Sequence, residues 1–359
     1  MTIRNFTAGP AMLPPEVREE AENAIREVDG GLGILECSHR YPFFDHLMTE
    51  LETDFRELGG ISEDYVVLFL QGGATLQFCT LPYVFTAPGD HIDVLHTGFW
   101  TRNAMRDAVK YTEVCYAYDG KDNGYSHIPR NNEIKYSENP KYVYYCANNS
   151  FLGTEWLVPP ANAPAPLVAD MSSNFYSKPL ILKDHGFIFA SAQKNLGIAG
   201  CCIVIISRQF LENQRPGMPS MFDYRRLAEN RSMLNTPPTF ALYVMRRMVA
   251  WMKRQGGLEA IERNNIRKAR IIRDAIDATH GFFAHSGDPE SRSRMNISFR
   301  SPSAEMDALF VSEAEKEGLI GLRGHRETGG LRASVFNAFP VEGCEELADF
   351  IRSFAQKFG

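Results

Sequence analysis

Short apolar runs alternate with longer amphipathic stretches along the first two thirds of the chain. The runs have the length of buried strands, and the stretches between them have the length and periodicity of helices. Strands are predicted at 65–70, 91–95, 141–146, 166–170, 186–191 and 201–206, and helices at 14–28, 42–58, 74–85 and 101–109. This alternation is typical of an α/β fold in which helices cover both faces of a mostly parallel sheet.

The last third of the chain has a different pattern. A helical stretch from about 239 to 279 follows two prolines and is broken near Gly256-Gly257, and we interpret it as the bridge to a second domain. Strands are predicted after it at 295–300 and 331–336, and helices at 303–317 and 342–357. We therefore predict an N-terminal arm (1–15) that associates with the small domain, a large domain (16–256) and a small C-terminal domain (257–359).

Composition narrows the class of protein. With 359 residues and 44% hydrophobic content, the chain can bury a large core. A net charge of −6 argues against nucleic-acid binding driven by the overall field. The seven cysteines have neither metal-ligand spacing nor a disulfide pattern, which favours a reducing, cytosolic setting and no metal site. No run approaches the roughly 18 apolar residues that cross a bilayer, so neither membrane insertion nor secretion is indicated.

A lysine between two apolar strands is the first candidate for chemistry. Lys194 follows the run 187–192 and precedes the predicted strand at 201–206. Burial would lower its pKa toward the range where a neutral amine attacks a carbonyl. The small side chains of Ser191 and Ala192 would leave room for a flat ligand. A lysine that caps a strand and points into solvent is the alternative, and this segment alone does not separate the two.

Asp170 ends the apolar run at 166–170, 24 positions before Lys194. An acid at one strand end and a lysine after the next strand suit pyridoxal phosphate. There, a carboxylate keeps the pyridine nitrogen protonated while a lysine holds the aldehyde. The alternative role for Asp170 is a helix N-cap, for which the following Ser172-Ser173 would be suitable.

A glycine turn after the strand at 65–70 is a candidate phosphate site. Gly72-Gly73 is followed by Ala74-Thr75 at the start of a predicted helix, and free amides at a helix start can bind an anion. Taken alone, this turn is more simply explained as a tight connection. Together with Lys194 and Asp170, it forms a specific combination.

Seven segments, in one order, extend a resemblance over almost the whole chain. They are 5–14 (NFTAGPAMLP), 38–40 (SHR), 71–73 (QGG), 192–195 (AQKN), 235–240 (NTPPTF), 324–326 (GHR) and 330–338 (GLRASVFNA). In these segments the chain resembles the phosphoserine aminotransferases, a family of fold-type I pyridoxal-phosphate enzymes in aminotransferase class V. The resemblance implies a seven-stranded, mostly parallel sheet in the large domain and a smaller α/β domain.

The resemblance assigns cofactor roles. Lys194 would hold the aldehyde as an internal aldimine, and Asp170 would pair with the ring nitrogen. Trp100 would stack on the ring, although a plain core tryptophan is the simpler interpretation without the resemblance. Ser150, where relatives usually have threonine, would donate its hydroxyl to the ring's phenolic oxygen. The implied phosphate ligands are Ala74, Thr75 and Gln193, with Asn235 and Thr236 from a neighbouring subunit; an Asn-Thr helix cap is the alternative for the last two.

Substrate roles follow in the same way. Arg332 would bind the α-carboxylate, because an arginine fork matches carboxylate oxygens. The set implied for the distal phosphate or γ-carboxylate is His39, Arg40, His325 and Arg326, drawn partly from the second subunit of a homodimer with shared sites. Solvated surface charges are the alternative for each pair. The implied reaction exchanges an amino group between L-glutamate and 3-phosphohydroxypyruvate, with ping-pong kinetics, to give O-phospho-L-serine and 2-oxoglutarate for serine biosynthesis.

Two departures from the family pattern and three other functions have to be weighed. Pro42 restricts Tyr41 to extended conformations and would reshape the loop that presents Arg40. Ala74-Thr75 replaces a glycine and an arginine found in some relatives, which would remove one charge from the phosphate site.

A cysteine desulfurase would need a reactive cysteine, and the acids beside Cys344 argue against one. An alanine–glyoxylate aminotransferase would not need the second His-Arg pair, and a non-catalytic dimer would not need Lys194.

Overall fold

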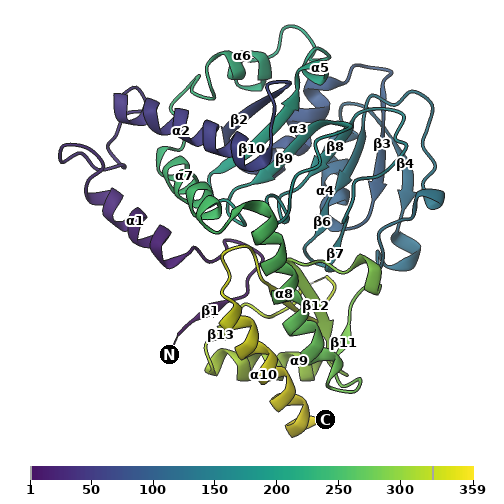
Figure 1. The fold of residues 1–359 in the computed structure, drawn as a ribbon. Coiled ribbons are helices and arrows are strands. Elements are labelled where there is room, and N and C mark those ends of the chain that lie inside the picture. Colours follow the sequence, from purple (N-terminus) through teal and green to yellow (C-terminus); the bar gives the residue numbers. More distant parts are fainter. Residues whose placement is uncertain (1, 326) are drawn as a thin grey trace.

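The structure is a computed structural model that describes residues 2–325 and 327–359. A seven-stranded sheet lies at its centre (Figure 1). Its strands are β2 (Tyr65–Gln71), β3 (His91–His96), β4 (Glu113–Asp119), β5 (Val143–Cys146), β8 (Leu167–Asp170), β9 (His185–Ser191) and β10 (Cys201–Ser207). They are arranged in the order β2-β10-β9-β8-β5-β3-β4, and only β10 runs antiparallel to its neighbours. The predicted mostly parallel α/β sheet is confirmed.

Helices cover both faces of this sheet (Figure 1). One face packs against α1 (Pro15–Arg26), α2 (Pro42–Gly59), α7 (Thr239–Arg254) and the start of α8 (Gly257–Asp277). The other packs against α3 (Ala74–Phe85), α4 (Phe99–Ala108), the short α5 (Arg208–Leu211) and α6 (Tyr224–Glu229). Two hydrophobic cores therefore lie on opposite sides of one sheet.

The continuous apolar runs follow from this double burial. Successive side chains of a strand point to opposite faces, so a strand covered on both faces needs apolar residues at every position. In β10, Ile203 and Ile205 belong to the core under α2 and α7, whereas Val204 and Ile206 belong to the core under α3 and α4. The runs that predicted buried strands thus supply both cores.

The C-terminal segment forms a third core. It contains the antiparallel strands β11 (Ala284–His285), β12 (Asn296–Arg300) and β14 (Leu331–Ser334), with α9 (Ala304–Lys316), α10 (Val341–Phe358) and the second half of α8. Near the N-terminus, β1 (Arg4–Asn5) pairs in parallel with β13 (Leu319–Ile320), and Phe6 is part of this core. The division into an arm, a large domain and a small domain stays a prediction.

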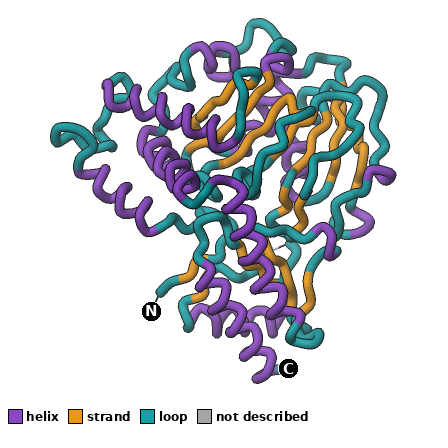
Figure 2. The backbone as a smooth tube through the Cα atoms, in the orientation of Figure 1, coloured by secondary structure: helices purple, strands orange, loops and turns teal. Residues whose placement is uncertain are grey.

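The long helical stretch breaks where the glycines predicted a break. Gly256 and Gly257 have φ angles of 94° and 78°, which favour glycine, and they separate α7 from α8. In Figure 2, α8 then runs from the large sheet toward the smaller one. The predicted bridge between the two sheets therefore exists as a helix that begins at this turn.

Most predicted elements occur within a few residues of their expected ends, and α3 has the predicted bounds. Strand β4 was not predicted. It is the edge strand of the large sheet, and its side chains from Glu113 to Tyr116 are exposed or half-buried, so its sequence lacks a long apolar run. The two-residue strands β6 (Asn148–Asn149) and β7 (Thr154–Glu155), which pair with each other, are also too short to carry a periodic signal.

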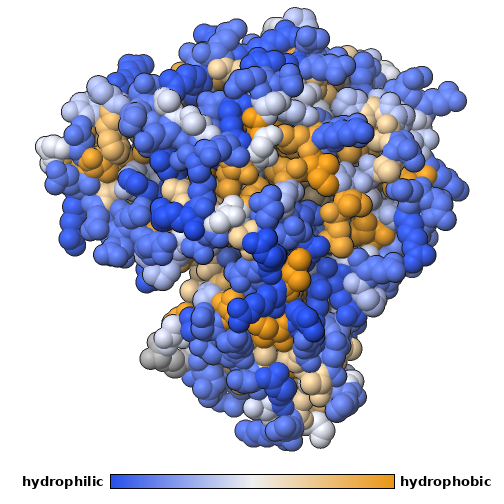
Figure 3. All heavy atoms as spheres, viewed as in Figure 1, coloured by the Kyte–Doolittle hydropathy of each residue, from blue (hydrophilic) through white to orange (hydrophobic). Residues whose placement is uncertain are grey.

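The face of the molecule in Figure 3 is mostly polar, with apolar side chains gathered in front of the large sheet. Exposed large apolar side chains include Leu157, Val158 and Ile181. Among the described residues, no helix combines the length and the apolar character that crossing a membrane requires.

Candidate active site

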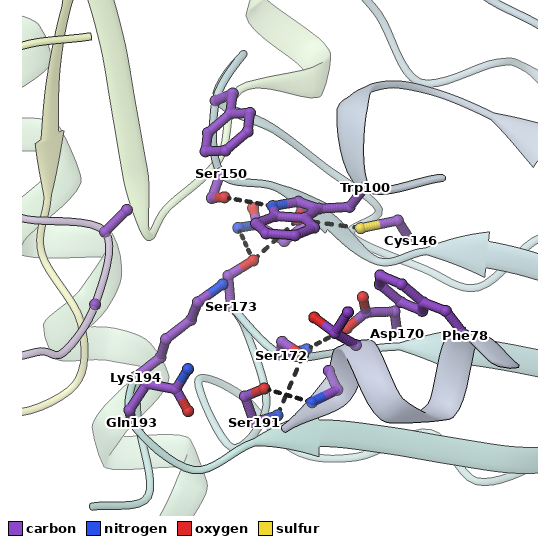
Figure 4. A pocket seen from close by; sticks show the side chains of 16 residues that line it. Phe78, Trp100, Cys146, Ser150, Asp170, Ser172, Ser173, Ser191, Gln193 and Lys194 are labelled. Atoms are coloured by element: carbon purple, nitrogen blue, oxygen red, sulfur yellow. Dashed lines mark hydrogen bonds between the residues drawn. The ribbon is translucent and has the colours of Figure 1, made fainter. Parts of the chain in front are cut away.

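A cavity of about 280 Å³ lies at the carboxyl ends of β5, β8 and β9 (Figure 4). Ligands of open α/β sheets bind at this edge, because the strand ends and the helix starts meet there. The predicted site residues that line it are Ala74, Thr75, Trp100, Ser150, Asp170, Gln193 and Lys194. Residues predicted from five separate segments of the sequence therefore meet in one place.

Lys194 extends into this cavity from the connection between β9 and β10. Its Nζ lies 5.8 Å from the centroid of the Trp100 ring. Burial lowers the pKa of Lys194, the nearby Asp170 and Cys146 oppose this shift, and the charge of Arg332 adds to it. The side chain keeps accessible surface, and that surface faces the cavity. The alternative of a strand cap that points into bulk solvent is therefore wrong.

Gly9 approaches the stem of this lysine closely. It has a φ of 121°, and a Cβ at this position would lie 3.3 Å from Lys194 Cγ. The N–H of Ala11 donates to the carbonyl oxygen of Gln193 at 2.9 Å, so the N-terminal segment is fixed along the lysine-bearing loop. A side chain at Gly9 would press on the lysine, which explains why the segment 5–14 carries a glycine there.

Asp170 is the last residue of β8, and its Oδ1 accepts the N–H of Ser172 at 2.9 Å. Burial raises the pKa of Asp170, while hydrogen bonding from Ser172 and the charge of Lys194 act in the opposite direction. No helix begins at this strand end, so the alternative of a helix N-cap is wrong. Asp170 is instead a buried carboxylate that a cationic partner in the cavity would keep ionised.

Two serines connect the phosphate turn to Asp170. The N–H of Ala74 donates to Ser191 Oγ at 2.8 Å, and the N–H of Ser191 donates to Ser172 Oγ at 3.1 Å (Figure 4). Since the N–H of Ser172 in turn donates to Asp170, the start of α3, the end of β9 and the segment after β8 are held by one set of bonds. Sequence reasoning treated Ser191 only as a small side chain.

The start of α3 presents an anion-binding end to the cavity. Its N-cap is Gly73, which has no side chain to occupy the first turn, and Gly72 has a φ of 101° that favours glycine. Helix N-termini attract anions through their free amides and their dipole. Thr75 and Gln193 also line the cavity, and their role as phosphate ligands stays a prediction.

Trp100 and Ser150 are hydrogen-bonded to each other across the cavity wall. The Trp100 Nε1–H donates to Ser150 Oγ at 3.1 Å (Figure 4). Trp100 is only half-buried and lines the cavity, so it is not a plain core tryptophan. Because Ser150 accepts this bond, its own hydroxyl proton remains available to donate elsewhere.

Arg332 lies in β14 next to the cavity, with only 8% of its surface exposed. Its Nη1 donates to the carbonyl oxygen of Ser150 at 3.2 Å, and its guanidinium lies 5.5 Å from the centroid of the Phe151 ring. Burial lowers the pKa of Arg332. In the described part of the chain its Nε has no hydrogen-bond acceptor and no carboxylate pairs with it. A buried guanidinium without a counterion is suited to bind an anion.

His325 stacks on Phe151, the aromatic residue that Arg332 also contacts. Its ring lies 3.8 Å from the Phe151 ring at an angle of 12°, and its Nδ1 accepts the N–H of Glu327 at 3.3 Å. Phe151 therefore contacts both His325 and Arg332, although sequence reasoning did not select it. Arg326, which was predicted together with His325, lies outside the described residues.

Six of the described predicted residues do not line this cavity. Arg332 and His325 contact its wall through Ser150 and Phe151, whereas no such contact is seen for His39, Arg40, Asn235 and Thr236. Arg40 is exposed in the connection between α1 and α2, and its N–H donates to Ser38 Oγ. Tyr41, the next residue, is extended with φ −78° and ψ 142°, as expected before a proline. Asn235 donates to Gln71 Oε1 at 3.3 Å.

Known proteins are similar to this chain over nearly its whole length. The model of the class V aminotransferases, described as "Aminotransferase class-V", matches residues 3–347. The chain belongs to the class V aminotransferases. It is 41% identical to a phosphoserine aminotransferase of Herpetosiphon aurantiacus over the whole of both chains.

Solved structures agree over the same extent. The phosphoserine aminotransferase of Bacillus circulans subsp. alkalophilus is 37% identical with a TM-score of 0.97, covering 100% of this chain and 99% of that one. A pyridoxal-phosphate-bound phosphoserine aminotransferase from Trichomonas vaginalis is 36% identical with a TM-score of 0.92, covering 98% and 100%. The aminotransferase fold, predicted from motifs, is confirmed.

Several residues that line the cavity were not predicted. They are Ala8, Gly9, Phe78, Cys146, Asn148, Phe151, Ser172, Ser173 and Ser191. Cys146 ends β5 in the way that Asp170 ends β8, so the rule that ligands sit at strand ends could have found it. The remaining ones lie beside predicted residues, but no residue type among them signals this chemistry by itself.

Proposed function

We propose that this class V aminotransferase is a phosphoserine aminotransferase that uses pyridoxal phosphate. It would transfer the amino group reversibly between L-glutamate and 3-phosphohydroxypyruvate. The observation that carries the proposal is a cavity lined by Lys194 and the buried Asp170, with the buried Arg332 bonded to its wall at Ser150. The full-length relatives at about 41% identity bear the same name and support it.

The cavity suits the cofactor. Its volume of about 280 Å³ is near the lower end of small-molecule sites, which begin at roughly 300 Å³. Lys194 would hold the aldehyde, Asp170 the ring nitrogen, and Trp100 one face of the ring. The start of α3, with Thr75 and Gln193, would hold the phosphate. Each polar group of the cofactor would therefore have a protein partner that is either uncharged or of opposite charge.

When bound, pyridoxal phosphate supplies an electron-withdrawing ring that stabilises negative charge at the substrate's α-carbon. Lys194 moves the proton: its lowered pKa makes the neutral amine accessible, so Nζ can take a proton from that carbon and return it. Asp170 would hold a proton on the ring nitrogen, because its buried carboxylate is little screened by water. Trp100 excludes water from one side of the reacting atoms.

Arg332 orients the substrate. Its guanidinium, buried and without a carboxylate partner in the described chain, would bind the α-carboxylate shared by glutamate and phosphoserine. His325 stacks on Phe151, the residue that Arg332 also contacts, and would contact the distal phosphate or γ-carboxylate. Because both substrates carry an anion at each end, one pocket can serve both half-reactions.

A homodimer would complete this pocket. His39, Arg40, Asn235 and Thr236 are polar residues outside the cavity of their own chain, and we propose that they reach the cavity of a second copy. The expected mass in solution is about twice 40.5 kDa, measured by light scattering on the purified chain. A monomer of full activity would contradict the shared site. A cytoplasmic location, which free thiols on all seven cysteines support, completes the proposal.

The other functions fit the site less well. Cys344 belongs to the core under α10, and burial raises its pKa to about 12, so it is not a reactive thiol for desulfuration. An alanine–glyoxylate enzyme acts on substrates with no second anion and would not use His325. A non-catalytic dimer would not need Lys194 and Asp170 in one cavity.

A coupled assay with glutamate tests the proposed substrate. We expect kcat/KM for 3-phosphohydroxypyruvate to exceed that for hydroxypyruvate by at least about 100-fold, because a charged group bound in a cationic pocket contributes about 2–5 kcal/mol. Measurement of both substrates on the same preparation controls for cofactor content. Equal rates with the two compounds, or a preference for glyoxylate as acceptor, would overturn the assignment.

A further inference from the structure

Lys268 is a fully buried lysine that the reaction does not use. It lies in α8 with 0% of its surface exposed. Its Nζ donates to the carbonyl oxygens of Val335 at 3.1 Å, Phe336 at 2.6 Å and Asn337 at 3.3 Å. These bonds use all three protons of the ammonium group.

This position is costly for a cation. Burial lowers the pKa of Lys268 to about 7, and Cys344 in α10 is the titratable group that acts against this shift. In the part of the chain that the structure describes, Lys268 forms no ion pair with a carboxylate. A methionine would fill the same volume without desolvating a charge, so packing alone does not account for a lysine here.

The three carbonyls belong to the segment that follows β14. That strand ends at Ser334, and it carries Arg332, three residues before Val335. Lys268 therefore holds the end of the strand that presents the buried guanidinium to the cavity.

Asn337 connects the same segment to the lysine-bearing loop. Its N–H donates to Asn195 Oδ1 at 3.0 Å, and Asn195 directly follows Lys194. The Asn337 Nδ2 donates to the carbonyl oxygen of Tyr176 at 2.9 Å, in the segment after β8. Asn337 is 1% exposed, so these bonds are shielded from water and are costly to break.

Asn265 completes this junction from α8. It lies three residues before Lys268, and its Nδ2 donates to Asn337 Oδ1 at 2.9 Å and to the carbonyl oxygen of Ser177 at 3.0 Å. Helix α8 thus holds the segment that follows Arg332 and the segment that follows Asp170 directly, and it reaches the Lys194 loop through Asn337.

We propose that Lys268 is a positioning residue that fixes the placement of Arg332 relative to Lys194. The proposal rests on the proposed function, in which one substrate must reach both groups at once. An α-carboxylate on Arg332 places the α-carbon where Nζ of Lys194 must meet it, and a shift of about 1 Å can lower the rate about 100-fold. The three bonds from Lys268 to backbone carbonyls set the distance between Arg332 and Lys194 without touching the cavity.

The test compares Lys268→Met with Lys178→Met. Lys178 is the control, because its Nζ also donates to carbonyl oxygens, of Trp156 at 3.0 Å and Leu157 at 2.7 Å, in a segment that carries none of the three groups. Unlike Lys268, it also lies 3.7 Å from a carboxylate oxygen of Glu155. We expect Lys268→Met to lower kcat/KM for glutamate at least 30-fold and to shift the pH at which the absorption of lysine-bound cofactor changes. Lys178→Met should leave both within twofold.

Amide hydrogen exchange of the cofactor-free protein gives a readout that needs no activity. The N–H of Asn337 should exchange at least tenfold faster in Lys268→Met than in the wild type and in Lys178→Met. If Lys268→Met does not fold, Asn265→Ala removes two bonds of the same junction without removing a charge, and the same changes in kcat/KM and in Asn337 exchange are expected.

The outcomes separate this proposal from the proposed function. A wild-type chain inactive on glutamate and 3-phosphohydroxypyruvate sinks the function, while the cofactor titration and the amide exchange still report on Lys268. Lys268→Met or Asn265→Ala with a lower melting temperature but unchanged kcat/KM, titration and Asn337 exchange shows a merely structural lysine and overturns the positioning role.

Discussion

Replacing Lys194 with alanine is expected to lower turnover with glutamate and 3-phosphohydroxypyruvate by at least about 10⁴-fold, because the variant loses both the amine that holds the cofactor and the base that moves the proton. The lysine-bound cofactor absorbs in the near-ultraviolet to violet, and this band should be absent from Lys194→Ala. Initial rates in the coupled assay and the spectrum of the purified variant measure the two effects separately.

Lys178→Ala is the control for this experiment, since Lys178 is a largely buried lysine that does not line the cavity. Its removal should lower stability and leave the absorption band in place. Normal turnover by Lys194→Ala, or an unchanged band, would mean that a different amine does the chemistry and that the site has been assigned to the wrong residue.

Buried charges beside the cavity shift the pKa of Lys194 in opposite directions. Lys194 and Arg332 repel each other, and Asp170 attracts Lys194, so the pKa of the lysine depends on groups from β8 and β14 as well as on burial. An anion on Arg332 would cancel its repulsion and favour the protonated lysine. In the proposed reaction, binding of a carboxylate and uptake of the α-proton would therefore be coupled through the same three side chains.

The positions of the proposed catalytic pair, Asp170 and Lys194, could be predicted because they follow a rule of topology. Asp170 ends one buried strand and Lys194 follows the next, and the carboxyl ends of parallel strands meet at one edge of the sheet. Apolar runs give the strand ends directly. The family resemblance then adds Trp100 and Ser150, whose hydrogen bond no pattern in the sequence could have indicated.

Other parts of the site depend on contacts between distant segments. The bonds from Ala74 to Ser191 and from Ser191 to Ser172 join residues 117 and 19 positions apart. Serine has no residue-type signal for such a role. Phe151, which contacts both Arg332 and His325, is an ordinary aromatic residue in the sequence and becomes informative only through these neighbours.

The fold shows the same division. Helix α3 was predicted with its full bounds, because Gly73 starts it and its residues are apolar on the sheet side. Strand β4 was missed, since an edge strand needs few apolar residues. The parallel pair of β1 with β13 was missed as well, because its two strands lie far apart in the sequence. Periodicity reveals burial within one element, whereas pairing between elements of low burial leaves no comparable trace.

Replacing Asp170 with asparagine is expected to lower kcat by about 10³-fold while the cofactor remains attached to Lys194. Asparagine has the same shape, and its Oδ1 can still accept the N–H of Ser172. It has no charge to hold a proton on the ring nitrogen, and losing one partner of a buried ion pair costs about 3–5 kcal/mol, which is about a 10²- to 10⁴-fold effect on rate. Stopped-flow measurement of each half-reaction would give the change in kcat, with cofactor content checked by absorbance.

Asp93→Asn is the matched control for Asp170→Asn. Asp93 is also a fully buried aspartate in the large sheet, where it accepts the Ser137 N–H at 2.8 Å and the Ser137 hydroxyl at 2.6 Å, but it does not line the cavity. Its substitution should lower the melting temperature and change kcat by less than about threefold, because it touches no reacting atom. If the two variants lost activity equally, the effect of Asp170→Asn would come from weakened packing, and the carboxylate would have no electrostatic role in the reaction.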